Sequence, residues 1–307
     1  MKILNINHND GDAVGSQLVL EYSYGRENVK VERCNYNNVN GVLYDYLKNG
    51  EHKNYDLIYI TDISISEKMA EWVDKDFSDK VKLVDHHSTA LWLNKYKWAT
   101  VKEVDDKGRK ISATKLLAQI EEIGNYVLLD VVECINDYDC WHWAENGNMK
   151  AKNFNDLLYL VGFDEIIESV HQQLFDTKTT YQFDEKYEFL LEIRDREYKH
   201  YLESSDKSIQ VVEYDGYKAG VVMAERFTSE LGNDLAKLHP ELDFIALLNM
   251  RSGLSLRGVK EGIHLGEIAK EIGGLIGANA GGHPRASAIS LTSEYKLGFL
   301  KEMFDIV

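Results

Sequence analysis

Histidine and aspartate residues alternate in a short segment near the start of the chain. His8, Asp10 and Asp12 are two positions apart, so in an extended turn their side chains can point the same way. One imidazole and two carboxylates suit a divalent ion such as Mn²⁺ or Mg²⁺, and the absence of thiolates disfavours zinc. Gly11 and Gly15 flank this turn beside an expected helix start, where free N–H groups favour a phosphate. For this segment alone, an Asx-rich turn that caps the helix is the simpler alternative.

Two further segments carry the same kinds of side chain. Asp62 directly follows an apolar run, and Asp85, His86 and His87 come at the end of another. Adjacent histidines at a strand end point in different directions, so one can bind a metal while the other faces a substrate, with Asp85 fixing a ring tautomer. Taken alone, Asp62 is also typical of a helix N-cap, and the histidine pair of a protein surface. Their occurrence together favours a shared site.

The number of candidate ligands fits a site for two metal ions. Such sites hold ions about 3.5–4 Å apart, commonly with a bridging carboxylate, and activate water for in-line attack on phosphorus. A sixth ligand would come from Asp137 or Asp139, after a helical stretch. The other five are His8, Asp10, Asp12, Asp62 and His86.

The elements that must position these residues alternate between strand and helix patterns. Short runs rich in Val, Ile, Leu and Tyr predict strands at Lys2–Asn7, Val29–Arg33, Asp56–Thr61 and Lys80–Val84. Apolar residues at helical spacing predict helices at Val14–Tyr24, Val42–Lys48, Glu67–Asp74, Ala113–Gly124 and Val127–Asn136. This order implies a mostly parallel sheet, whose ligand crevice lies beyond the carboxyl ends of the strands. The acids and histidines would therefore gather at one edge of one sheet.

A second α/β unit is predicted after a charged helical stretch at about Asp184–Ser204. Its predicted strands are Ile209–Tyr214, Ala219–Met223, Phe244–Asn249 and Ala286–Leu291, and its helices are Ser229–Leu238 and Leu265–Ile272. Gly281 and Gly282 let backbone N–H groups approach a phosphate closely. His283 and Arg285 add polar and cationic groups beside them, and Arg257 can clamp a phosphate oxygen. A simple turn before the last strand is the alternative for the glycine pair.

The composition limits the partners. There are 35 Lys and Arg against 51 Asp and Glu, a net charge of −16, and an acidic surface repels long polyanions such as duplex nucleic acid. No apolar run reaches the roughly 18–20 residues of a membrane span, and the N-terminus has no signal-peptide pattern. Three cysteines without CxxC spacing favour a reducing compartment. We therefore expect a cytoplasmic protein without a membrane partner.

The ordered motifs of the chain resemble those of the DHH phosphoesterase superfamily. The N-terminal motifs are HNDGDAVGS (His8–Ser16), ITD (Ile60–Asp62), LVDHHST (Leu83–Thr89) and INDYDCW (Ile135–Trp141). The C-terminal part resembles the DHH-associated domain through LSLRG (Leu254–Gly258), HLGEIA (His264–Ala269) and AGGHPRASA (Ala280–Ala288). The resemblance covers essentially the whole chain.

The resemblance implies two Mn²⁺ ions, with Mg²⁺ or Co²⁺ as substitutes. The first would bind His8, Asp10 and Asp62, and the second Asp12, Asp62, His86 and an aspartate of the fourth motif. Asp62 would bridge the two ions. Both Asp137 and Asp139 fit the fourth motif, with Asp137 slightly preferred.

For the remaining site residues, the resemblance implies catalysis and substrate binding. His87 would face the scissile phosphate or the leaving group, and Asp85 would support it. The substrate-binding residues would be Arg257, Gly281, Gly282, His283 and Arg285.

The resemblance also implies a two-domain α/β fold with the active site in a cleft between the domains. These are a catalytic domain with a mostly parallel sheet at 1–175, a helical linker at 176–205 and a smaller substrate-binding domain at 206–307. The expected activity is metal-dependent hydrolysis of short oligonucleotides to mononucleotides, as in oligoribonucleases that degrade nanoRNA. The alternatives are a cyclic or linear dinucleotide phosphodiesterase, a 3′-phosphoadenosine 5′-phosphate phosphatase and a non-hydrolytic nucleotide-binding module. A homodimer is compatible with this assignment.

Overall fold

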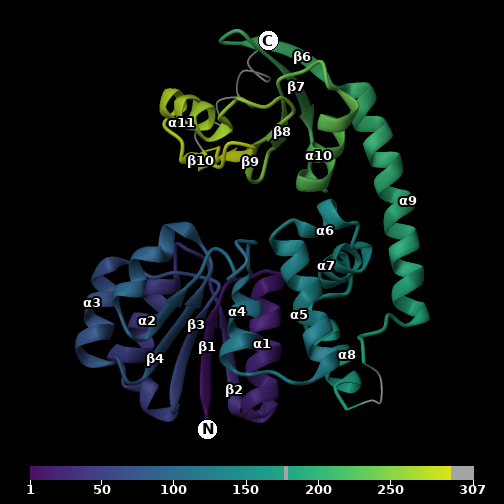
Figure 1. Ribbon diagram of the computed structural model, residues 1–307. Helices are drawn as coiled ribbons and strands as arrows, with labels where there is room; N and C mark the ends of the chain where they lie inside the picture. Colours follow the sequence, from purple (N-terminus) through teal and green to yellow (C-terminus); the bar gives the residue numbers. More distant parts are fainter. Residues whose placement is uncertain (176–178, 292–307) are drawn as a thin grey trace, which may run out of the picture. The chain divides into compact units, whose positions relative to one another are not determined.

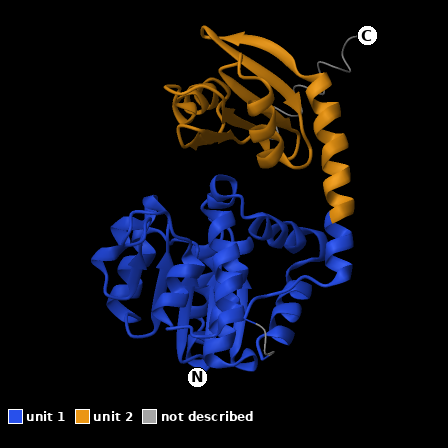
Figure 2. Cartoon of the chain, turned by 45° about the vertical axis from the view of Figure 1, so that its right-hand side comes forward, with its two compact units in different colours: residues 1–191 blue, residues 192–307 orange. Residues whose placement is uncertain are grey.

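The computed structural model describes residues 1–175 and 179–291 and divides the chain into two compact units (Figure 2). Unit 1 comprises Met1–Leu191, and unit 2 comprises Glu192–Val307. One long helix, α9 (Glu185–Ser208), spans the limit between them. The predicted helical linker at 176–205 and the predicted cleft between the domains both stay predictions.

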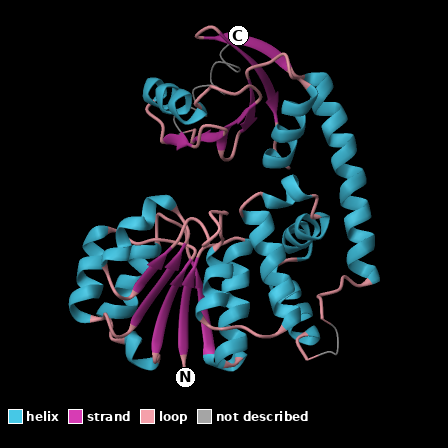
Figure 3. Cartoon of the chain, in the orientation of Figure 1, coloured by secondary structure: helices cyan, strands magenta, loops and turns pink. Residues whose placement is uncertain are grey.

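Unit 1 contains a five-stranded sheet in which every strand pair is parallel (Figure 3). The strand order is β2-β1-β3-β4-β5. The strands are β1 (Ile3–Asn7), β2 (Val29–Arg33), β3 (Leu57–Thr61), β4 (Val81–Asp85) and β5 (Ala99–Val101). The predicted parallel sheet is confirmed. The sequence analysis missed β5, because three residues are too short to show an alternating pattern.

Helices cover both faces of this sheet (Figure 1). Strand β1 shows how one strand serves both layers, because Ile3 packs into one hydrophobic cluster while Leu4 and Ile6 pack into the other. One face carries α2 (Val39–Lys48) and α3 (Glu67–Asp76). The other carries α1 (Gly11–Tyr24) and α4 (Ala113–Ile120). Behind these two helices pack α5 (Tyr126–Asp139), α7 (Met149–Val161) and α8 (Phe163–Gln173), which belong to the same hydrophobic cluster. The short helices are α6 (His142–Asn146), η1 (Arg26–Asn28), η2 (Glu51–Asn54) and η3 (Ser88–Lys95).

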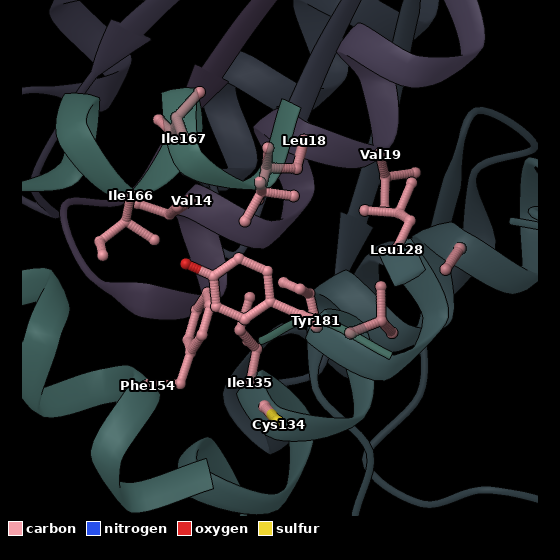
Figure 4. Close-up of a cluster of buried hydrophobic side chains, with 14 of the residues drawn as sticks. Val14, Leu18, Val19, Leu128, Cys134, Ile135, Phe154, Ile166, Ile167 and Tyr181 are labelled. Atoms are coloured by element: carbon pink, nitrogen blue, oxygen red, sulfur yellow. The ribbon is translucent and has the colours of Figure 1, made fainter. Parts of the chain in front are cut away.

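The larger core of unit 1 joins α1 and α5 to the helices that follow them (Figure 4). Tyr181 is fully buried in it, and its ring meets that of Phe154 edge-on at 5.6 Å. The Tyr181 hydroxyl lies 2.9 Å from Ser169 Oγ, so the buried phenol is satisfied. These contacts fix α7 and α8 against the helix that ends at the candidate site.

Unit 2 contains a six-stranded mixed sheet in the order β10-β11-β9-β8-β7-β6. Among the described residues of this unit, β7 and β8 are the one parallel pair, and the other neighbouring strands are antiparallel. Its helices, α10 (Thr228–Leu238) and α11 (Leu265–Ile276), contribute to two separate hydrophobic clusters. The strands are β6 (Gln210–Tyr214), β7 (Tyr217–Met223), β8 (Phe244–Asn249), β9 (Gly253–Gly258), β10 (Ala280–Gly282) and β11 (Ala286–Ile289). The predicted smaller α/β unit is confirmed, although β9 and β10 were missed.

Within the described residues, none of the helices has the length and apolar character needed to cross a lipid bilayer.

Candidate metal centre

Three neighbouring strands of unit 1 end in the residues that the sequence analysis identified. His8 follows β1, Asp62 follows β3, and β4 ends at Asp85. These strands are adjacent and parallel, so their carboxyl ends meet at the same edge of the sheet. The end of α5 brings Asp139 to the same place.

The first donor group consists of His8, Asp10 and Asp62, whose ligand atoms lie within 4.8 Å of one another. His8 Nδ1 lies 2.6 Å from Asp10 Oδ2 and 3.7 Å from Asp62 Oδ2. Asp10 is also the N-cap of α1, where its Oδ1 accepts a hydrogen bond from the Ala13 N–H at 3.1 Å. Asp10 thus serves both as the cap of α1 and as a member of the first donor group.

The second donor group consists of Asp12, His86 and Asp139. His86 Nε2 lies 3.7 Å from Asp12 Oδ2 and 3.6 Å from Asp139 Oδ2. It also lies 3.4 Å from Asp62 Oδ1. The two oxygens of Asp62 therefore face different groups, which is the geometry that a bridging carboxylate requires.

Asp62 has an unusual backbone conformation for a buried residue. Its φ angle is +58°, in the left-handed region that residues other than glycine rarely adopt. The residue is only 1% exposed, and its Oδ2 has no hydrogen-bond partner. Such conformations cost energy and occur often at functional sites. Here the left-handed turn aims the Asp62 carboxylate at both donor groups.

Asp12 is held by the N-terminus of α4. Its Oδ2 accepts from the Ala113 N–H at 2.7 Å, and its Oδ1 accepts from the Thr114 N–H at 2.8 Å. The helix dipole further stabilises the negative charge. This approach depends on Gly15, because a Cβ there would lie 2.5 Å from Thr114 Oγ1 and 2.6 Å from Ile135 Cδ1. Gly15 is thus a packing residue, whereas the sequence analysis placed it beside a phosphate site.

We expect Gly15→Ala to lower the melting temperature of the protein. The added methyl group would force α1 away from α4 and α5, and overpacking of this kind costs about 1–3 kcal/mol. Gly41→Ala is the matched control, because a Cβ at this position in α2 would meet no atom within 4 Å. The control should be neutral or slightly stabilising, since alanine favours a helix. Equal melting temperatures for the two variants would contradict this reading of Gly15.

Burial and the crowding of carboxylates determine the electrostatics of the site. Burial and the charge of Asp12 raise the pKa of Asp62 well above its ordinary value. Burial and Asp12 also raise the pKa of Asp139 to about 7, although its side chain is 27% exposed. The hydrogen bond with Asp10 and the nearby carboxylate of Asp62 raise the pKa of His8 to about 10. A divalent cation would oppose all of these shifts, because it stabilises anionic carboxylates and neutral imidazole as ligands.

The donor set fits a pair of divalent metal ions. Both groups consist of carboxylate oxygens and imidazole nitrogens without a thiolate, a combination that suits Mn²⁺, Mg²⁺ or Co²⁺. The buried Asp62 Oδ2, which lacks a hydrogen-bond partner, also supports metal binding at this site. A buried carboxylate is stable only when it is paired, hydrogen-bonded or bound to a metal.

Asp137 lies outside both donor groups, whereas Asp139 belongs to the second, so the structure favours Asp139 as the proposed ligand of the fourth motif. Its Oδ2 accepts hydrogen bonds from Asn146 Nδ2 at 3.1 Å and from Asn148 Nδ2 at 2.8 Å. Asp137 therefore fastens the segment after α5, while Asp139 joins His86 in the second donor group.

His87 is fixed from two sides. Its Nδ1 lies 2.7 Å from Oδ1 of the fully buried Asp85, which also accepts from the His86 and His87 backbone N–H groups. Its Nε2 lies 3.2 Å from the Tyr36 hydroxyl. The Tyr36 ring also contacts His8, with 5.4 Å between the ring centroids.

The sequence analysis missed Tyr36 as a site residue. It lies in the asparagine-rich segment after β2, and such a segment is also typical of an ordinary turn. Because β2 is parallel to β1, this segment follows a carboxyl end at the same sheet edge as the ligands. The position of Tyr36 after a parallel strand was therefore the signal in the sequence that could have identified it as a site residue.

The substrate-binding residues predicted for the C-terminal domain lie around one hairpin of unit 2. Gly281 and Gly282 belong to β10, and His283 begins the turn into β11, with its N–H donating to the Ala286 carbonyl at 2.8 Å. Gly282 has a φ angle of +142°, and a Cβ there would meet the backbone of Ser287 at 2.5 Å. Glycine is therefore required at this position.

The two arginines of this unit have different neighbours. The guanidinium of Arg257 donates to Ser229 Oγ at 2.9 Å, whereas that of Arg285 donates to the Lys260 carbonyl at 3.1 Å. Burial lowers the pKa of Arg257. Backbone pairing brings their positions together, since Arg257 in β9 is in register with Ala286 in β11. Convergence of both side chains on one ligand stays a prediction.

Known proteins are similar to this chain in sequence or in fold. Residues 215–307 match the DHHA1 domain family. The oligoribonuclease NrnB of Bacillus subtilis strain 168 is 36% identical over 312 residues, covering 98% of this chain and 75% of that protein. RecJ from Thermus thermophilus, in complex with Mn²⁺, has a TM-score of 0.60 at 11% identity, covering 97% of this chain and 51% of that one. A pGpG-specific phosphodiesterase from Vibrio cholerae has a TM-score of 0.53 at 10% identity, covering 99% and 98% of the two chains.

Proposed function

The chain belongs to the DHH phosphoesterase superfamily, and from this premise we propose that it hydrolyses short oligoribonucleotides to mononucleotides with two bound divalent metal ions. The observation that carries the proposal is the pair of donor groups that both face Asp62. Similarity to an oligoribonuclease over nearly the whole chain supports this class of substrate. The Mn²⁺ of the RecJ structure supports manganese as the ion, with Mg²⁺ or Co²⁺ as substitutes.

The ligands divide between two ions in this proposal. His8, Asp10 and Asp62 would hold one, while Asp12, His86 and Asp139 would hold the other together with Asp62. When bound, such a pair supplies an activated water and stabilises negative charge that develops at phosphorus. Asp62 would contribute to both ion sites, and the first N–H groups of α4 hold the Asp12 carboxylate in its ligand orientation.

His87 is proposed to act on the leaving group or on a phosphate oxygen. The Asp85 carboxylate accepts from Nδ1–H, so the substrate would meet Nε2, which it would share with the Tyr36 hydroxyl. Asp85 would also stabilise the cationic imidazolium that can donate a proton from Nε2 to a departing ribose oxygen. In unit 2, Arg257, Gly281, Gly282, His283 and Arg285 are proposed to bind the end of the substrate.

Tyr36 is proposed to position His87, and Tyr36→Phe tests this role. The variant keeps the ring and loses one hydrogen bond to Nε2, so we expect kcat to fall about fivefold, which corresponds to about 1 kcal/mol. KM and the melting temperature should change little. Steady-state kinetics would measure the effect, with Tyr126→Phe as the control, because Tyr126 is 69% exposed. An unchanged kcat in Tyr36→Phe would rule out the positioning role.

Relative kcat/KM values would decide between the proposed substrate and its alternatives. The purified chain with Mn²⁺ is given RNA di- to pentamers, a cyclic dinucleotide and 3′-phosphoadenosine 5′-phosphate in parallel. The proposal expects the highest kcat/KM for the short RNAs. A higher value for either of the other substrates would replace the oligoribonuclease assignment with that activity. Binding without any product would identify a nucleotide-binding module.

A further inference from the structure

Residues 102–111, between β5 and α4, form a compact hairpin in unit 1. An antiparallel bridge joins Val104 to Lys110. Oδ1 of Asp105 accepts hydrogen bonds from the N–H groups of Lys107 and Arg109, both at 2.9 Å. Gly108 closes the turn with a φ angle of +76°. The loop thus has its own hydrogen-bonded structure, which can hold side chains in defined places.

This hairpin, named the basic hairpin below, is rich in cations within an acidic part of the chain. Residues 102–111 contain four basic and three acidic residues, whereas the whole chain has a net charge of −16. Lys107, Arg109 and Lys110 are exposed, and none of them forms an ion pair with any residue that the structure describes. Lys102 lies 3.8 Å from Asp106, and Lys115 pairs with Glu133 at 2.7 Å. Three cations are therefore available to an external anion.

Both ends of the basic hairpin are joined to the candidate metal centre. At its start, the Lys102 N–H donates to the carbonyl of Asp85 at 3.1 Å. Just beyond its end, the N–H groups of Ala113 and Thr114 hold the Asp12 carboxylate. The hairpin therefore rises from the same sheet edge as the ligands.

A third contact joins the hairpin to the segment after α5. The carbonyl of Lys110 lies 3.0 Å from His142 Nε2, three residues beyond Asp139. This contact fixes the hairpin to the segment that follows the proposed ligand Asp139.

We propose that the basic hairpin binds backbone phosphates of nucleotides beyond the scissile bond, and so favours oligoribonucleotides of three or more residues over dinucleotides. This inference rests on the proposed function. A dinucleotide places its only internal phosphate at the metal ions, whereas each further nucleotide adds one phosphate that the hairpin can bind. Lysine and arginine contacts to phosphate carry no base preference, so the selection is for length and not for sequence.

The test uses a triple variant, Lys107→Gln with Arg109→Gln and Lys110→Gln, in the full chain with Mn²⁺. We expect the ratio of kcat/KM for an RNA pentamer to that for a dimer to fall about tenfold. The dependence of log kcat/KM on log salt for the pentamer should become less steep by about 2 for three contacts, at roughly 0.7 per phosphate of a single strand. The control replaces Lys48, Lys53 and Lys75 by Gln. These residues are also exposed and precede β3 or β4, at the opposite edge of the sheet.

Two results would overturn the inference. One is an unchanged pentamer-to-dimer ratio in the hairpin variant, and the other is an equal fall in the control, which would show a general effect of net charge. Binding of a labelled RNA pentamer is measured as well, in two proteins that both carry Asp62→Asn to prevent turnover. One of them also carries the three hairpin substitutions, and the other does not. Failure of the proposed function shows separately, as absence of hydrolysis by the wild type. In that case a roughly tenfold weaker binding by the hairpin variant still supports the hairpin site, and equal binding rejects it.

Discussion

Replacing Asp62 by asparagine is expected to reduce hydrolysis of a short oligoribonucleotide by at least about a thousandfold, or about 4 kcal/mol of transition-state stabilisation. The two carboxylate oxygens of Asp62 face the two donor groups, so one substitution weakens both proposed ion sites. Asparagine is preferable to alanine here, because it tolerates the left-handed backbone at φ +58° and preserves the shape of the side chain. Steady-state hydrolysis measures the loss.

The melting temperature of the Asp62→Asn variant provides a second test of the bridging role. Without added metal, Asp62→Asn should melt no lower than the wild type, because it removes one charge from a cluster of repelling carboxylates. Added Mn²⁺ should raise the wild-type melting temperature, since a ligand that binds the folded state stabilises it. This rise should be largely absent in the variant. Asp45→Asn, at an exposed position in α2, is the control. Retained turnover with a wild-type response to Mn²⁺ would contradict the bridging role.

The pair Asp139→Asn and Asp137→Asn should separate a ligand from a structural residue two positions away. Asp139 belongs to the second donor group, so we expect its variant to lose roughly a hundredfold in kcat. Asp137 instead accepts hydrogen bonds from Asn146 and Asn148, so its variant should lose about 1 kcal/mol of stability. Turnover by Asp137→Asn should stay within a few-fold of wild type.

Metal titration followed by melting temperature provides the second measurement for this pair. Asp137→Asn should keep the stabilisation by Mn²⁺, starting from a lower melting temperature, while Asp139→Asn should lose part of that stabilisation. The reverse pattern would return the ligand role to Asp137.

The strands that carry the site were predictable because their residues follow simple rules. The first four strands are short runs that contain Val or Ile and are separated by helical patterns, and their limits agree with the structure to within one residue. Strands β9 and β10 were not predictable from the sequence. Gly253–Gly258 (β9) begins and ends with glycine, and Ala280–Gly282 (β10) consists of alanine and two glycines. Such segments become strands only through pairing with β8 and β11, which a local pattern does not contain.

The site itself was predictable where a ligand directly follows a strand, and less so elsewhere. His8 and Asp62 follow β1 and β3, so the parallel order of the strands was enough to bring them together. The fourth motif lies at the end of a helix, where positions two apart face different sides. The choice between Asp137 and Asp139 therefore depended on where α5 ends and how it packs.

The central claim, metal-dependent hydrolysis of short RNA, is tested most directly by product analysis of a 5′-labelled RNA pentamer with the purified full chain. We predict that mononucleotides accumulate when Mn²⁺ is present and that their formation stops on chelation with EDTA. Formation of mononucleotides at the same rate in EDTA, or no product with Mn²⁺, Mg²⁺ or Co²⁺, would contradict the account.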